Sequence, residues 1–134
     1  MQASRLVRIA AVAAAVFGVL TVITGALALF GGGQAQAAVG NAVPFVLWFN
    51  FLAGFAYVAV AFGIWRGLRW GAWTALALAA STAMVAIAFG VHVMGGAAYE
   101  MRTVGALSLR LVFWVVLAAV VMRSTPAAPQ ARAA

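Results

Sequence analysis

Long stretches without a charged side chain dominate this sequence. No Asp, Glu, Lys or Arg occurs between Arg8 and Arg66, and none occurs between Arg69 and Glu100. Because a helix needs about 20 apolar residues to cross the hydrocarbon of a bilayer, the first stretch can cross twice and the second once. The segment 103–122, which contains one charge, supplies a fourth crossing. The pattern therefore predicts an integral membrane protein.

The overall composition agrees with a lipid environment. Of the 134 residues, 68% are hydrophobic and 7% are charged, whereas a soluble domain is about half apolar and about one quarter charged. So short a chain cannot hide that much apolar surface in an aqueous core. The net charge of +7 comes from Arg residues at segment ends rather than on one polar face, which argues against a nucleic-acid partner.

We predict an all-α fold in which four transmembrane helices form an antiparallel, up-down bundle. The chain is one membrane domain, 1–134, and its tail, 124–134, is predicted to be disordered. Pro44 suits the first turn of a helix, and the link 66–69 is short enough to force an antiparallel hairpin. The predicted helices cover residues 9–30, 44–65, 70–93 and 103–122.

The N-terminal segment has a competing interpretation as a secretory signal peptide. Its front is basic, and Ala35-Gln36-Ala37 resembles a cleavage site with small residues. Its apolar run is about 22 residues, however, and signal peptides carry about 7 to 15. We therefore predict that the segment is retained as a membrane helix.

The Arg residues also predict the orientation. An even number of crossings places both termini on one side, together with most of the Arg residues, and the positive-inside rule assigns that side to the cytoplasm. We predict a multi-pass protein of the bacterial inner membrane with both termini cytoplasmic. The residues on the cytoplasmic side are Arg5, Arg8, Arg66, Arg69, Arg123 and Arg132, accompanied at the interface by Trp65, Trp70 and Trp73.

Each predicted helix carries a stripe of small or polar residues at helical spacing. Membrane helices associate through such residues, so the stripes are expected to face one another, while Phe51, Phe55 and Phe62 suit lipid contact. The stripes are Ala14, Gly18, Thr21 and Gly25; Asn50, Ala53, Gly54, Tyr57 and Ala61; Thr74, Ser81, Ala88 and His92; and Thr103, Ala106, Arg110, Trp114 and Ala118.

The distinctive polar residues gather toward the predicted outer side. Threading the helices at 1.5 Å per residue places them at a similar level, and lipid offers them no partners. We therefore predict an outward-facing polar pocket with Arg110 as its positive centre and Glu100 as the counter-charge. The candidate ligand-binding residues are Asn50, His92, Tyr99, Glu100, Arg102 and Arg110.

Each residue of this cluster also has a plainer interpretation. Arg110 can snorkel toward outside water, and Glu100 can complement a helix dipole. His92 can hydrogen-bond a loop carbonyl, or act as a proton relay, a haem ligand or a metal ligand shared across a dimer. Asn50 can join two helices.

Several kinds of chemistry are excluded within one chain. There is no Cys and no Asp, and there is one Glu and one His. Disulfide exchange, iron–sulfur clusters, carboxylate-pair catalysis and a closed metal site are therefore not available. We predict no catalytic residue, no metal and no cofactor.

Two stretches resemble a family of small, uncharacterised bacterial membrane proteins with four helices. They are Val39–Phe55 (VGNAVPFVLWFNFLAGF) and Gly90–Gly105, which includes GGAAYEMRTVG. The resemblance covers most of the chain and implies the four-helix fold, but it implies no activity. In size and helix count the chain is also similar to DoxX-like proteins.

These observations favour a non-enzymatic inner-membrane protein, either an accessory subunit or a small-ligand binder that uses the polar pocket. Its predicted partners are the lipid bilayer and either a second copy of the chain or another membrane protein. A small dimeric transporter is the alternative, and a membrane enzyme or haem protein is a third class.

The orientation can be tested with reporter fusions. Fusions after Arg69 and after Arg132 are expected to report the cytoplasm, because both positions lie on the Arg-rich side. Fusions near Gln36 and Gly96 are expected to report the periplasm. Cleavage after Ala37 would leave three helices and contradict the four-helix prediction.

Overall fold

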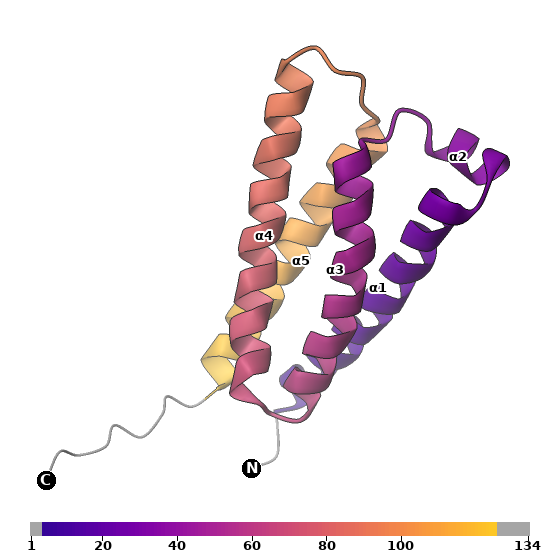
Figure 1. Cartoon of the computed structure of the whole chain (residues 1–134). Helices are drawn as coiled ribbons and strands as arrows, with labels where there is room; N and C mark the ends of the chain where they lie inside the picture. The colour runs from indigo at the N-terminus through magenta and orange to yellow at the C-terminus, as the bar shows by residue number, and fades with distance from the viewer. Residues whose placement is uncertain (1–3, 126–134) are drawn as a thin grey trace, which may run out of the picture.

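The computed structural model describes residues 4–125 of the chain, and all secondary structure among them is helical. Its long helices form an antiparallel, up-down bundle (Figure 1), and each is long and apolar enough to cross a membrane. The predicted fold class is therefore confirmed. The helices are α1 (Arg5–Phe30), α2 (Gly33–Val39), α3 (Pro44–Trp65), α4 (Arg69–Met94) and α5 (Met101–Ser124). Most of the predicted tail, from residue 126 onward, lies outside the described residues.

The long helices extend into the charged residues at their ends. Helix α1 begins at Arg5 rather than at residue 9, because the side-chain oxygen of Ser4 accepts a hydrogen bond from the Val7 N–H at 3.3 Å and caps the first turn. Helix α5 begins at Met101 and ends at Ser124, two residues beyond each predicted boundary. Apolar runs mark the hydrocarbon span, but a helix continues into the interface as long as its backbone is hydrogen-bonded.

The short helix α2 was missed by the sequence analysis, which treated residues 31–43 as a connection. Two glycines with positive φ bracket it, Gly32 at 84° and Gly40 at 64°. Between them lies the sequence GQAQAAV, and Ala and Gln are good helix formers. The signal for this helix was therefore present in the sequence.

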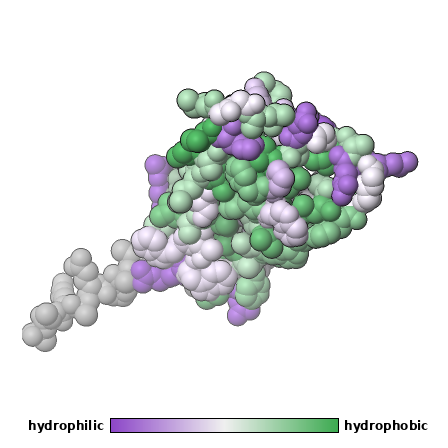
Figure 2. Space-filling view, turned by 45° about the horizontal axis from the view of Figure 1, so that its top comes forward, coloured by the Kyte–Doolittle hydropathy of each residue, from purple (hydrophilic) through white to green (hydrophobic). Residues whose placement is uncertain are grey.

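The start of α1, the α3–α4 link and the end of α5 share one end of the bundle (Figure 1). We call it the arginine-rich end, because it carries Arg5, Arg8, Arg66, Arg69 and Arg123. The opposite end, which carries α2 and the α4–α5 link, is the α2 end. Arg132 lies outside the described residues. Figure 2 shows hydrophobic residues covering most of the visible surface of the bundle.

Helices α1 and α3 make the most extensive contact in the bundle. A Cβ atom added at Gly18 would lie 2.9 Å from the Cβ of Tyr57 and 3.0 Å from the carbonyl oxygen of Gly54. A Cβ added at Gly54 would lie 3.0 Å from the backbone nitrogen of Val22. The two backbones therefore touch where both helices lack a side chain, as is typical of packing through small residues. All four residues of the stripe predicted on α1 are buried.

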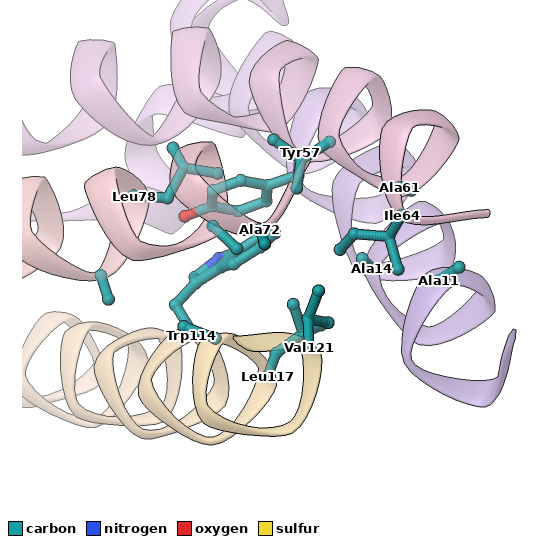
Figure 3. Packing of buried hydrophobic residues seen from close by; sticks show 14 of the residues in the cluster. Ala11, Ala14, Tyr57, Ala61, Ile64, Ala72, Leu78, Trp114, Leu117 and Val121 are labelled. Atoms are coloured by element: carbon teal, nitrogen blue, oxygen red, sulfur yellow. The ribbon is translucent and has the colours of Figure 1, made fainter. Parts of the chain in front are cut away.

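The core consists of two clusters along the bundle axis. The larger lies toward the arginine-rich end and contains Tyr57 and Trp114, which are fully buried, with ring centroids 4.6 Å apart. Figure 3 shows these two rings meeting between α3 and α5. The smaller cluster lies toward the α2 end and joins α3, α4 and α5 through Val43, Val46, Phe89 and Leu107.

The stripe predicted on α4 does not form its interior face. Thr74 and Ser81 are half-buried, whereas Ala88 and His92 are exposed. The hydroxyl groups of Thr74 and Ser81 each donate a hydrogen bond, at 2.7 Å, to the carbonyl four residues earlier in their own helix. Because these bonds satisfy the hydroxyls locally, the interior face of α4 is free to be apolar. Its buried residues are Gly71, Ala72, Ala75, Leu78, Ala79, Thr82 and Phe89.

The contact between α1 and α3 can be tested with Gly54→Leu. The added side chain would meet the backbone of α1, so we expect the free energy of unfolding to fall by about 1–3 kcal/mol, as at other overpacked sites. The measurement is the melting temperature of the purified protein in detergent. Gly105→Leu is the matched control, since a Cβ at Gly105 in α5 meets nothing within 4 Å. Equal melting of the two variants would contradict the close packing.

Candidate binding site

A cavity of about 580 Å³ lies toward the α2 end, between α1, α2, α3 and α5. This volume falls within the range of about 300–1,000 Å³ that is typical of sites for small molecules. Small and aliphatic residues form most of its wall. They include Gly25 and Ala28 on α1, Ala35 and Ala38 on α2, Val46 and Leu47 on α3, and Ala106 on α5.

The cavity brings together four of the six predicted site residues. Asn50 lines it from α3, Arg102 and Arg110 line it from α5, and Glu100 lines it from the residue that precedes α5. Thr21, Thr24 and Thr103 add hydroxyl groups to the wall. The sequence analysis placed Thr21 and Thr103 on interior stripes but did not connect them, or Thr24, with the pocket.

His92 and Tyr99, the other two predicted residues, do not line this cavity. His92 is exposed, and its ring meets the ring of Phe45 edge-on with centroids 5.8 Å apart. Tyr99 is also exposed and contacts Phe89. The reason is that the smaller core cluster, which includes Phe89, fills the space between α4 and the cavity. Depth along a helix gives the level of a residue but not its direction around the bundle.

Glu100 and Arg102 attach the α2 segment to the start of α5. The Glu100 Oε1 atom accepts a hydrogen bond from the backbone N–H of Asn41 at 2.9 Å. The Arg102 guanidinium donates a hydrogen bond to the carbonyl of Ala38, near the C-terminal end of α2, at 2.6 Å. Asn41 follows Gly40, whose positive φ turns the chain toward Glu100. We call these two bonds the roof clasp, because they hold α2 over the end of the cavity.

The roof clasp corrects the predicted pairing of Glu100 with Arg110. The carboxylate of Glu100 accepts a hydrogen bond from Asn41. Glu100 and Arg110 lie ten positions apart in the sequence, which corresponds to about 15 Å along a helix axis. Arg110 is half-buried, and its Cζ atom lies 5.7 Å from the ring centroid of Phe17. Its side chain therefore faces Phe17 on α1.

Several buried polar atoms surround Arg110 without a hydrogen-bond partner in the described part of the chain. They are the Arg110 Nε, Asn50 Oδ1, Tyr57 Oη and Trp114 Nε1 atoms. The side chain of Tyr57 neighbours those of Arg110, Thr82 and Trp114. In a lipid environment an unpaired polar atom is costly. Of these four atoms, Arg110 Nε and Asn50 Oδ1 belong to residues that line the cavity, whereas Tyr57 and Trp114 are buried beside it and do not line it.

Tyr57, Thr82 and Trp114 lie next to Arg110 in the core and do not line the cavity. Among the described residues, no group of three or more His, Cys, Asp and Glu side chains could hold a metal ion.

The chain was compared with known proteins in three ways. No protein-family model, no curated protein and no solved structure matches it. The family resemblance of the two stretches described above therefore stays a prediction.

The roof clasp can be tested by hydrogen exchange. Glu100→Ala removes the acceptor for the Asn41 N–H, whereas Glu100→Gln keeps an oxygen in the same place. Hydrogen bonds to charged groups are worth about 1.5–3 kcal/mol when buried and less when exposed, so we expect amide exchange across residues 33–42 to become about five- to tenfold faster in Glu100→Ala. Exchange in Glu100→Gln should change much less. Equal exchange in both variants would show that the carboxylate does not hold the roof.

Proposed function

We propose that this protein is a non-enzymatic binding protein of the bacterial inner membrane, and that its ligand is a small anionic molecule held in the cavity. The observation that carries the proposal is the position of Arg110. It lines an apolar-walled cavity within a membrane-spanning helix, and Glu100, the one carboxylate side chain in the sequence, is bonded elsewhere.

Placing the cationic side chain of Arg110 within a membrane-spanning helix costs free energy. An Arg at the centre of a membrane helix costs about 2.5–3.5 kcal/mol on insertion scales. Arg110 also lies in the N-terminal half of α5, where the helix dipole does not favour a cation. An anion in the cavity would offset both effects, and the planar guanidinium fork matches a carboxylate or phosphate through two parallel hydrogen bonds.

The neighbouring groups support a ligand with polar atoms at one end. Asn50 lines the cavity together with Arg110 and can both donate and accept hydrogen bonds. Small and aliphatic side chains form most of the remaining wall, with hydroxyl groups from Thr21, Thr24 and Thr103. Ligand sites commonly combine such apolar walls with a few polar groups that orient the ligand.

We further propose that the arginine-rich end faces the cytoplasm, which places the cavity in the periplasmic half of the membrane. Five Arg residues lie at that end, and exposed Trp65, Trp70 and Trp73 accompany them. Arg8 packs over the ring of Trp65 with its Cζ atom 5.9 Å from the centroid. This combination of Arg and Trp is typical of the cytoplasmic interface.

Selective binding of an anion tests the proposal. The purified protein in nanodiscs of zwitterionic lipid is titrated with radiolabelled dodecanoate, dodecanol or dodecyltrimethylammonium, and binding to empty nanodiscs is subtracted. We expect dodecanoate to bind at least tenfold more tightly than the neutral and cationic probes. Arg110→Gln should weaken dodecanoate binding by about tenfold or more, since a hydrogen-bonded charge contributes about 1.5–3 kcal/mol.

The control is Arg123→Gln, which removes an exposed Arg at the opposite end and should leave dodecanoate binding unchanged. Arg110→Lys keeps the charge without the fork and should give an intermediate affinity. If the three probes bind equally, or if Arg110→Gln binds dodecanoate as the wild type does, the proposed function is wrong.

A further inference from the structure

The gap between α1 and α5 forms one side of the cavity, which residues of both helices line. Close to the arginine-rich end the two helices belong to one core cluster, in which Ala11 and Ala14 of α1 join Leu117 and Val121 of α5. Toward the α2 end, beyond Phe17 and Arg110, the same two helices line the cavity instead of packing together. Their overall contact is accordingly much smaller than that between α1 and α3.

Small side chains explain why the helices do not close this gap. The cavity-lining residues of α1 include Thr24, Gly25 and Ala28, and those of α5 include Thr103 and Ala106. These short side chains occupy less of the space between the two helices than the aromatic rings do nearer the arginine-rich end. Phe17 contacts both Phe113 and Arg110, with a ring-centroid distance of 4.6 Å to Phe113.

The other sides of the cavity are occupied. Helix α3 packs closely on α1, the smaller core cluster closes the side toward α4, and α2 with its roof clasp covers the α2 end. The side of the cavity between α1 and α5 is the one that these elements do not cover. It lies at the level of membrane-spanning residues, so it faces acyl chains rather than water.

We infer that the ligand is a single-chain amphiphile with an acidic headgroup, which enters from the bilayer between α1 and α5. Its headgroup pairs with Arg110, and its chain lies along the aliphatic wall and through the gap. This inference rests on the proposed function and adds the ligand class and the route. A fatty-acid carboxylate has the required chemistry: an anion for the guanidinium and one flexible apolar chain for a narrow opening.

The first test compares carboxylate ligands of different chain length and then fills the gap between α1 and α5 with a larger side chain. Wild-type protein in nanodiscs should bind dodecanoate at least tenfold more tightly than butyrate after the empty-nanodisc background is subtracted. Ala106→Phe places a ring in the cavity wall and should weaken dodecanoate binding by tenfold or more. Gly105→Phe is the matched control, because its side chain points into open space from the neighbouring position, and its affinity should equal that of the wild type. Circular dichroism and gel filtration establish that each variant is folded.

The second test locates the chain in the unmodified protein. Dodecanoate labelled with ¹³C at its terminal methyl is bound in nanodiscs, and paramagnetic relaxation is measured with a doxyl lipid or with a water-soluble gadolinium chelate. We expect relaxation by the doxyl lipid and none by the chelate.

The outcomes separate the two proposals. If butyrate binds as tightly as dodecanoate and both depend on Arg110, the cavity binds anions but the amphiphile inference is wrong. Relaxation by the chelate alone, or unchanged binding in Ala106→Phe, would refute the lateral route. If the binding of butyrate and the binding of dodecanoate are both unaffected by Arg110→Gln, the proposed function itself is wrong.

Discussion

The close approach of α1 to α3 determines how the rest of the bundle can pack. Where Gly18 and Gly54 meet, each backbone occupies the space in which the other helix would carry a side chain. Membrane helices gain little from hiding apolar surface from lipid, so van der Waals contact of this kind is a principal source of their association. Because α1 packs against α3 along its length, it packs against α5 over only part of its length.

The cavity follows from this unequal division of contacts. Near the arginine-rich end, large side chains such as Trp114 and Ile64 fill the space between helices. Near the α2 end the facing residues of α1 and α5 are small, and a volume of about 580 Å³ remains. Arg110 marks the boundary between the two regions. At this level Arg110 and Phe113 of α5 both contact Phe17 of α1.

The charges at the α2 end have a structural task that differs from the predicted one. Glu100 and Arg102 both bond to the backbone of the α2 segment, so they fasten the roof rather than form the base of the site. The cavity therefore has a hydrogen-bonded roof at the α2 end and a cation farther along the bundle axis. The charged side chains that line the cavity are Glu100, Arg102 and Arg110, so the cationic side chains outnumber the carboxylate.

The sequence by itself determined the four membrane-spanning helices, their antiparallel order and the shared level of Asn50 and Arg110, because hydrophobic length and helical rise depend only on position along the chain. It also contained the signal for α2 in the run between Gly32 and Gly40. Direction around the bundle was decided only by the tertiary structure. His92 and Tyr99 lie at a suitable level but outside the cavity, and Phe89 of α4 packs against Val43 and Val46, which line it. The partner of Glu100 was likewise decided by a contact across 59 residues, which no local pattern specifies.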